Sequence, residues 1–275
     1  MRWYLAPAKI NLMLHVVGRR EDGYHDLQTI FQFLSEGDRL SYSINQSGVI
    51  DRSYDLGIAS TDDLTLRAAT LLREHVGDSS LGVTIGMDKR IPMGGGLGGG
   101  SSDAATTLCV LNELWEAGFS NDQLRQMALT LGADVPVFVG GFAAWAEGIG
   151  ERLTPISLPQ PWYVILTPPV AVSTARIFSH NDLTVHPQMK KIRALQREQI
   201  GVFGRNDLEP IVRALEPSVD RLIEWMSQYG PARMSGSGAS VFVPLASEQA
   251  AQHLLNERPA GTEGFVAQGI NTIVR

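Results

Sequence analysis

The sequence predicts an α+β fold in two lobes. Segments with strand-like and helix-like hydrophobic periods alternate along the 275 residues, without the long apolar runs of a parallel sheet. Three prolines, Pro155, Pro159 and Pro161, interrupt these patterns and predict a boundary between a domain at 1–157 and a domain at 158–275. A chain of this length can bury a sizeable core in one large domain or in two modest ones.

Composition excludes several classes of protein. The chain is 44% hydrophobic and 19% charged, as in ordinary globular proteins, and its net charge of −6 predicts neither nucleic acid nor an anionic membrane as a partner. The single cysteine, Cys109, cannot form an intramolecular disulfide and indicates a reducing compartment. No apolar run reaches the roughly 18 residues of a membrane span. We therefore expect a cytoplasmic protein, as a monomer or weak homodimer.

The first element is predicted to be a strand over Trp3–Val17, where apolar residues alternate. The alternation puts Lys9 and Asn11 on one face, opposite Leu14. A lysine in such a strand is either a rim residue with its amine in water or a functional group. Asp22 and Gly23 then predict a turn before Tyr24–His25, a pair that can grip a planar ring or simply fill a strand.

The next segments lead towards a glycine-rich stretch. A hairpin is predicted over 38–58 around Asn45–Gly48, and Thr61 is expected to cap a helix that ends near Gly77. A short strand over Leu81–Met87 then delivers two cations, Lys89 and Arg90, to the start of that stretch. These cations either attend a bound anion or are solvated at a strand end.

Six of the seven residues from Gly94 to Gly100 are glycine, with Leu97 the exception. Ser101 and Ser102 are expected to cap a helix that follows at once, and a glycine loop leading into a helix N-terminus is typical of phosphate binding. A flexible linker is the alternative. Pro92 and Met93 stiffen the entry, which favours the phosphate site. No Gly-Lys-Ser/Thr closes the loop, so it is not a Walker A motif.

A second informative stretch follows a helix predicted at 121–131 with Ser120 as its cap and Gly132 at its end. Here Pro136 is expected to keep Val135 extended and to place Asp134 in a short, stiff connection. Such an aspartate is either a loop cap or a functional carboxylate. The residues alone leave both readings open.

The second half of the chain alternates in the same way. Strands at 142–147 and 152–156 are predicted to form a hairpin, and further strands are predicted at 162–167, 241–244 and 265–270. Helices are predicted at 189–197, after a Ser218 cap, and around 250–255. A second glycine-rich element lies at Met234–Val241. The six histidines and one cysteine show no zinc or haem spacing. Gly236–Gly238 does not fit the Gly-x-Ser-x-Gly turn of serine hydrolases.

Three stretches together resemble the GHMP kinase superfamily over nearly the whole chain. They are Pro7–Leu12 with Gly23–His25, then Pro92–Ala105, then Gly236–Ser240. The resemblance implies an N-terminal ribosomal-protein-S5-like lobe and a C-terminal ferredoxin-like lobe. Together with the first stretch, Leu131–Phe138 is similar to members that use ATP to phosphorylate the 2-hydroxyl of a diphosphocytidyl methylerythritol. That reaction belongs to non-mevalonate isoprenoid precursor synthesis and implies Mg²⁺.

The resemblance also implies roles for individual residues. Asp134 would be the catalytic carboxylate that accepts the hydroxyl proton, and Lys9 the cation beside it. Tyr24, His25 and Phe178 would hold the cytosine ring of the alcohol substrate, with Asn11 nearby. The other positions implied for this substrate are Gly236, Ser237 and Gly238. The ATP site would contain Leu64, Lys89, Pro92, Met93, Gly94, Gly95, Gly96, Leu97, Gly98, Gly99, Gly100, Ser101 and Ser102. No Mg²⁺ ligand is identified.

One residue departs from the pattern, since relatives often carry asparagine where this chain has Asp63. A carboxylate cannot donate a hydrogen bond as an amide does, which affects the expected adenine contact. Two alternatives stand beside the main reading: another small-alcohol kinase of the homoserine or mevalonate type, and a non-catalytic nucleotide or RNA binder. The pair of Lys9 and Asp134 argues against a non-catalytic binder, because binding alone needs no base. The acidic net charge argues against RNA as the ligand.

Overall fold

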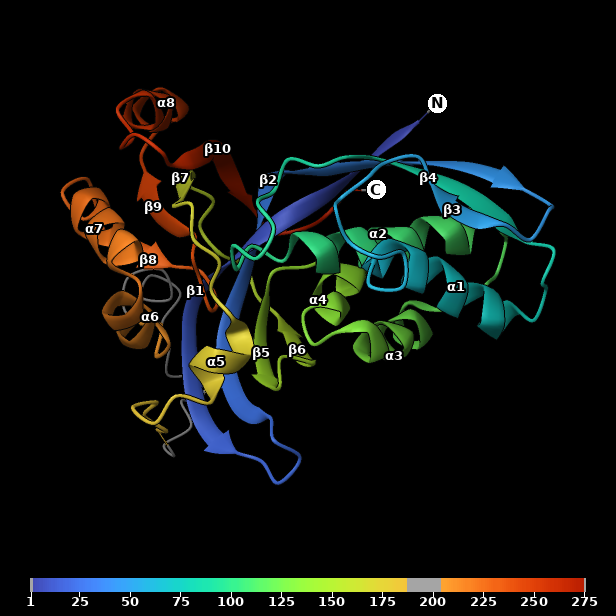
Figure 1. Ribbon diagram of the computed structural model, residues 1–275, viewed down its shortest axis with the longest axis horizontal. Coiled ribbons are helices and arrows are strands. Elements are labelled where there is room, and N and C mark those ends of the chain that lie inside the picture. The colour runs from blue at the N-terminus through green and yellow to red at the C-terminus, as the bar shows by residue number, and fades with distance from the viewer. Residues whose placement is uncertain (1, 187–203, 275) are drawn as a thin grey trace.

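A single long strand, β2 (His25–Asn45), organises the molecule. The computed structural model describes residues 2–186 and 204–274, and within them ten strands form one sheet. β2 pairs antiparallel with β1 (Trp3–Arg19), β4 (Gly82–Asp88), β5 (Ala144–Gly148) and β10 (Glu263–Ile270). The predicted α+β class is confirmed (Figure 1). The helix predicted at 189–197 lies outside the described residues.

Four helices cover one side of the N-terminal part of the sheet (Figure 1). They are α1 (Leu64–Val76), α2 (Gly99–Leu114), α3 (Asn121–Leu131) and α4 (Val135–Gly140). β3 (Ile50–Arg52) extends the sheet beside β4, and β6 (Arg152–Pro155) forms the predicted hairpin with β5. The apolar faces of these helices pack on the sheet in one core that includes Phe33, Leu72, Leu108 and Phe138.

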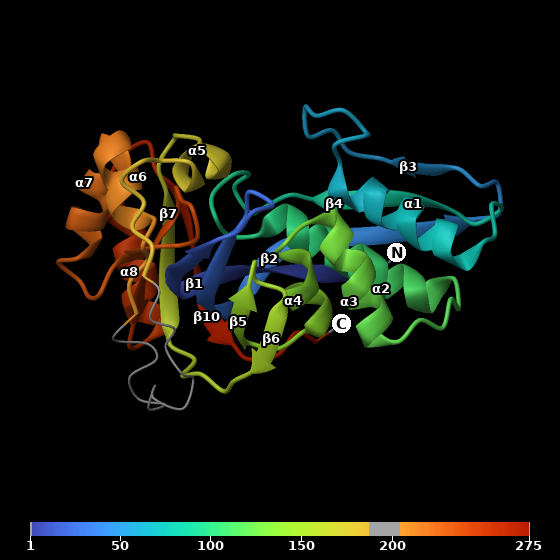
Figure 2. The same cartoon turned by 90° about the horizontal axis from the view of Figure 1, so that it is seen from below.

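The C-terminal part packs helices against its strands (Figure 2). Its strands are β7 (Trp162–Thr167), β8 (Arg233–Met234), β9 (Val241–Leu245) and β10. Its helices are α5 (Thr174–Phe178), α6 (Glu209–Leu215), α7 (Pro217–Met226) and α8 (Glu248–Asn256). The short elements α5, α6 and β8 carry too few residues for a period to be read from sequence.

The two parts share strands. Leu14 and Val16 of β1 lie in the core of the C-terminal part, and β10 returns to pair with β2. One sheet therefore contains strands from both sides of the predicted domain boundary. The division at 157/158 stays a prediction.

The hairpin predicted over 38–58 is wrong. β2 runs to Asn45, and the next strand, β3, pairs in parallel with β4 instead of folding back on β2. Residues 37–41 of β2 pair with β1 on one side, and residues 39–45 pair with β4 on the other. β4 therefore occupies the edge of β2 residues 39–45, and β3 adds at the free edge of β4.

Three predicted helix caps are also wrong. Asp63, not Thr61, caps α1, because its Oδ1 accepts the amide hydrogen of Thr65 at 2.9 Å. α2 begins at Gly99, so Ser101 and Ser102 lie inside its first turn, where their hydroxyls cannot cap it. Ser218 likewise lies inside the first turn of α7, which begins one residue earlier.

Pro136 does not keep Val135 extended. Val135 is the first residue of α4, and Pro136 follows it within the first helical turn. The amide hydrogens of a first turn have no partner inside the helix, so proline is tolerated there. Asp134 consequently stands at the N-cap of α4, although its side chain makes no capping hydrogen bond.

Replacing Asp63 with alanine is expected to destabilise the fold by about 2 kcal/mol, because this carboxylate both caps α1 and binds other groups. Oδ2 accepts hydrogen bonds from Arg52 at 2.7 Å and from Tyr54 at 2.9 Å. Urea unfolding measures the loss. The exposed neighbour Asp62, replaced by alanine, should change the free energy of unfolding little.

The pH dependence of this loss has a definite sign. Burial alone would raise the pKa of Asp63, but hydrogen bonds from Thr65, Arg52 and Tyr54 outweigh it and hold the pKa below its ordinary value. A lowered folded-state pKa stabilises the fold above the unfolded value, near pH 4, and the contribution disappears as pH falls through the folded value. The difference between the original protein and Asp63→Ala should therefore narrow below about pH 4. A constant difference from pH 7 to pH 3 would contradict the assignment.

Candidate active site

Two cavities adjoin at the glycine loop, Gly94–Gly100. The larger, of about 790 Å³, lies between β1, the turn before β2, and α5. The smaller, of about 310 Å³, lies between the loop and the start of α1. Gly94, Gly96, Gly98 and Ser101 line both cavities. Ligands in the two cavities would therefore meet at the loop.

The glycine loop is docked on both halves of the molecule. Lys9 of β1 donates its backbone hydrogen to the oxygen of Leu97 at 2.9 Å, and the backbone of Ser240 donates to Gly95 at 3.1 Å. Gly96 has a φ of +75°, and a Cβ there would lie 2.2 Å from the backbone oxygen of Ser235. Only glycine fits this close approach. The loop is thus a packed structural element and not a flexible linker.

Lys9 and Asp134 meet in the larger cavity, next to the glycine loop that lines both cavities. The Nζ of Lys9 lies 3.3 Å from Oδ2 of Asp134 and donates to the backbone oxygen of Gly96 at 3.0 Å. Lys9 is 2% exposed, whereas the side chain of Asp134 is 36% exposed. The lysine is therefore not a rim residue. A buried ammonium holds a carboxylate that remains accessible from the larger cavity.

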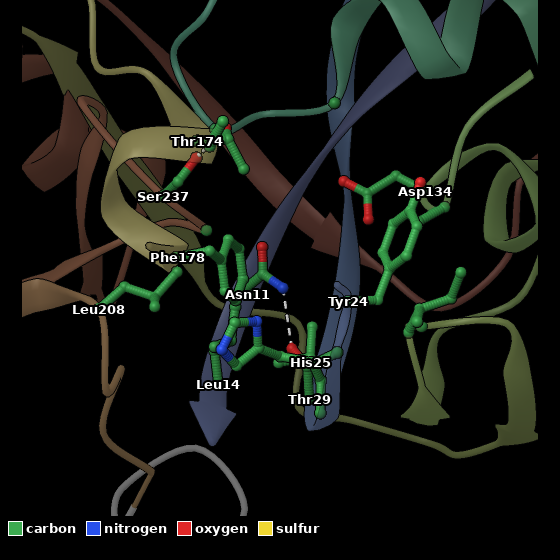
Figure 3. Close-up of a pocket in the computed structure, with 18 of the residues that line it drawn as sticks. Asn11, Leu14, Tyr24, His25, Thr29, Asp134, Thr174, Phe178, Leu208 and Ser237 are labelled. Atoms are coloured by element: carbon green, nitrogen blue, oxygen red, sulfur yellow. Dashed lines mark hydrogen bonds between the residues drawn. The ribbon is translucent and has the colours of Figure 1, made fainter. Parts of the chain in front are cut away.

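A hydrogen-bonded chain orients Asn11. The hydroxyl of Thr29 donates to the backbone oxygen of Met13 at 2.6 Å, so it accepts the amide hydrogen of Asn11 at 2.8 Å (Figure 3). The carbonyl oxygen of Asn11 then faces Lys9 and accepts from Nζ at 2.6 Å. Lys9 and Asn11 share a face of β1, as predicted.

Three aromatic or imidazole rings stand in the larger cavity. The rings of His25 and Phe178 lie 5.3 Å apart with a 35° tilt, and Tyr24 is 58% exposed on the side of Asp134 (Figure 3). His25 Nε2 is buried without a hydrogen-bond partner. Burial, with a smaller effect from Arg19, lowers the pKa of His25, so its ring is neutral at pH 7. A planar ligand with polar edges fits this environment.

The smaller cavity contains most of the positions predicted for ATP. Leu64, Lys89 and Pro92–Ser101 line it, together with Met87 and Asp63. Ser102 lines neither cavity and is fully buried, with no partner for its hydroxyl. Asp63 cannot offer a free carboxylate there, because both of its oxygens already accept hydrogen bonds.

Of the predicted substrate positions, Asn11, Tyr24, His25, Phe178, Gly236 and Ser237 line the larger cavity. Gly238 does not, and a Cβ there would instead lie 2.8 Å from the sulfur of Met234. Arg90 lines neither cavity, and its guanidinium pairs with Asp88 at the surface at 2.7 Å.

Sequence reasoning missed several lining residues, among them Leu14, Leu27, Val172, Thr174 and Leu208. The alternation on β1 placed Leu14 opposite Asn11, yet both line the larger cavity. A register irregularity between Asn11 and Met13 accounts for the difference, since a bulge shifts every later side chain by one position. Thr174 and Ser237 share a hydrogen bond of 2.7 Å at one wall of the cavity, a contact between residues 63 positions apart (Figure 3).

Two comparisons with family models fit this architecture. Residues 63–142 match the GHMP kinases N-terminal domain, and residues 189–261 match the GHMP kinases C-terminal domain. The chain belongs to the GHMP kinase family, so it is a phosphotransferase that uses ATP. Among the described residues, no helix is long and apolar enough to cross a membrane.

Individual relatives are similar over nearly the whole chain. A protein of Nitrosospira multiformis named 4-diphosphocytidyl-2-C-methyl-D-erythritol kinase is 53% identical over 97% of this chain and 90% of its own. One of Marinobacter nauticus with the same name is 48% identical, over 97% and 93%. The crystal structure of 4-(cytidine 5'-diphospho)-2C-methyl-D-erythritol kinase has a TM-score of 0.84 at 34% identity, covering 98% of this chain and 99% of that one. A mevalonate kinase structure from L. major, at 16% identity and a TM-score of 0.69, shares the fold, covering 100% of this chain and 97% of that one.

Proposed function

We infer that this chain transfers the γ-phosphoryl group of ATP to the 2-hydroxyl of 4-diphosphocytidyl-2-C-methyl-D-erythritol. The observation that carries the assignment is the Lys9–Asp134 pair, which lines the ring-lined cavity and contacts the glycine loop through the bond from Lys9 to Gly96. Relatives with that activity in their names support the choice of alcohol.

The two cavities divide the reactants. ATP occupies the smaller one, with its phosphates on the loop and at the N-terminus of α2, where backbone amides and the helix dipole favour anions. The alcohol occupies the larger one. Its hydroxyl oxygen forms the new bond to the γ-phosphorus while the bond to the β,γ-bridging oxygen breaks and ADP leaves. The hydroxyl proton passes to Asp134.

Lys9 stabilises the charge that develops in this step. Its ammonium lies beside the carboxylate that accepts the proton and is fixed by Asn11 and Gly96. A buried, pre-oriented cation stabilises a developing alkoxide more strongly than a solvated one, because no solvent has to reorganise. Lys9 and Asp134 therefore act as one unit.

The ring-lined end of the larger cavity holds the cytosine. Tyr24 and Phe178 supply aromatic faces, and the unpartnered Nε2 of His25 supplies a hydrogen bond to the edge of the base. A neutral imidazole can either donate or accept there. A mevalonate or homoserine molecule has no ring to place against these side chains.

Mg²⁺ accompanies ATP in this proposal. Within residues 2–186 and 204–274 no group of three His, Cys, Asp or Glu side chains is placed to hold a metal. Oxygen donors that line the cavity beside the loop include the Asp134 carboxylate and the Ser101 hydroxyl. Two such donors suit an ion that is carried mainly by phosphate oxygens. When bound, the ion neutralises charge on the phosphates.

The direct test is a coupled ADP-release assay with Mg-ATP and each of three alcohols: the diphosphocytidyl methylerythritol, mevalonate and homoserine. Turnover with the cytidyl alcohol alone is expected. Turnover with either of the others alone would reassign the acceptor. ATP binding without turnover on any alcohol would favour a non-catalytic nucleotide binder.

Replacing Tyr24 with alanine is expected to raise the KM for the cytidyl alcohol about tenfold and to leave the KM for ATP within about twofold, because Tyr24 lines only the larger cavity. Steady-state kinetics with each substrate varied in turn measure both constants. Tyr229, which is 41% exposed beside Trp225, provides the matched control when replaced by alanine. A rise in the KM for ATP alone would reverse the assignment of the two cavities.

A further inference from the structure

Three charged side chains lie directly beneath the glycine loop. The Nζ of Lys89, just after β4, lies 2.6 Å from Oδ2 of Asp38 on β2 and 2.7 Å from Oδ2 of Asp103 in α2. Asp38 is fully buried and Asp103 is 2% exposed. One ammonium thus joins a strand, the segment that leads into the loop, and the helix that leaves it.

The same carboxylate also holds the backbone at the entry to the loop. Oδ1 of Asp38 accepts the amide hydrogens of Arg90 at 2.6 Å and of Ile91 at 2.8 Å. A Cβ on Gly99, the first residue of α2, would lie 3.2 Å from Nζ of Lys89 and 3.3 Å from Oδ2 of Asp38. The cluster therefore touches the N-terminus of α2, where the phosphates of ATP are placed.

Charge balance explains why the ammonium stays in the cluster. If Lys89 turned towards a phosphate, Asp38 and Asp103 would remain as two uncompensated carboxylates in the interior, which is strongly unfavourable. Lys89 opposes the rise in the pKa of Asp103 that burial causes, so the ammonium favours the ionised form of that carboxyl. Asp38 and Asp103 together hold the cation by hydrogen bonds of 2.6 and 2.7 Å.

We propose that Lys89 is a positioning residue whose ammonium cross-links β2 to α2, and so holds the glycine loop and the N-terminus of α2 ready for ATP without contacting the phosphates. This proposal deepens the role of the ATP cavity and rests on the assignment of ATP to it. It does not depend on which alcohol is phosphorylated.

The test uses a variant that removes the cross-link but keeps the charge of the cluster. Lys89→Met alone leaves two facing carboxylates and is at risk of misfolding. Combining it with Asp103→Asn leaves only Asp38 charged, so the sum of formal charges in the cluster stays at −1, as in the original protein with its two carboxylates and one ammonium. Arg90→Met is the matched control, because that neighbouring cation pairs only at the surface with Asp88.

Two measurements are made on these full-length proteins without any alcohol. Amide hydrogen exchange of the nucleotide-free protein over residues 94–102 is expected to be at least about fivefold faster in the double variant. Calorimetry is expected to show ATP binding weakened about tenfold. Arg90→Met should leave both within about twofold.

The outcomes separate the possible roles of Lys89. Weaker ATP binding with unchanged exchange in the nucleotide-free protein would mean that Lys89 contacts the phosphates directly, and would overturn the proposal. Unchanged binding and exchange would overturn it as well. Because neither measurement involves the alcohol, a failure here is distinguishable from a failure of the proposed reaction.

Discussion

Replacing Asp134 with asparagine is expected to lower kcat by at least about 10²-fold while ATP binding stays within about twofold, because the amide cannot accept the hydroxyl proton. Asparagine has nearly the same shape, and Asp134 makes no capping hydrogen bond that the fold requires. The side chain is also 36% exposed, so the change disturbs no buried packing. Turnover by ADP release and ATP affinity by calorimetry measure the two quantities.

Asp122→Asn is a useful comparison for that experiment, because Asp122 is an exposed carboxylate in the first turn of α3 that lines neither cavity. It should leave kcat unchanged. A kcat for Asp134→Asn close to that of the original protein would remove the proposed proton acceptor. The fold and the glycine loop would be unaffected by that result.

Replacing Lys9 with methionine is expected to lower kcat by about 10²-fold to 10³-fold, which is the effect of removing one pre-oriented electrostatic group. Methionine matches the lysine stem, whose Cε lies beside Gly98 and near the ring of Phe138. Asp134 is partly exposed and is not left as a buried unpaired charge. The thermal unfolding midpoint should therefore stay close to that of the original protein although kcat falls. Parallel measurement of both quantities distinguishes a catalytic role from a structural one.

The double variant Lys9→Met with Asp134→Asn tests whether the two residues act together. Groups that act as a unit give non-additive losses, so the double variant should be about as slow as the slower single variant. Multiplied losses would mean that Lys9 and Asp134 act independently. They would then contribute to separate steps of the reaction.

The sequence predicted the elements whose signal is local. The strand predicted over Trp3–Val17, the capping box of Ser120 with Gln123, and the hairpin of β5 with β6 all appear where the pattern indicates them. The glycine loop also leads directly into a helix, although the helix begins at Gly99 rather than after the serines. In each case the period or the cap depends on residues within one element, so neighbouring positions are sufficient to predict it.

Local signals failed where two elements compete for one position. Thr61, Ser101 and Ser218 are all acceptable cap residues, but α1 begins after Asp63, α2 at Gly99 and α7 at Pro217, so residue type alone does not select the cap. The hairpin after β2 failed for a similar reason, since β4 arrives later in the chain and takes the edge that β3 would need.

By itself, the sequence predicted the α+β class and a glycine loop that leads into a helix, because spacing and residue type carry that information, whereas the pair of Lys9 and Asp134 was implied by the family resemblance. Only the tertiary structure decided which charges meet. Lys89 bonds Asp38, which lies 51 positions away, and a bulge in β1 places Leu14 in the same cavity as Asn11. Such contacts depend on how distant segments pack, and a hydrophobic period describes only how each segment faces its core.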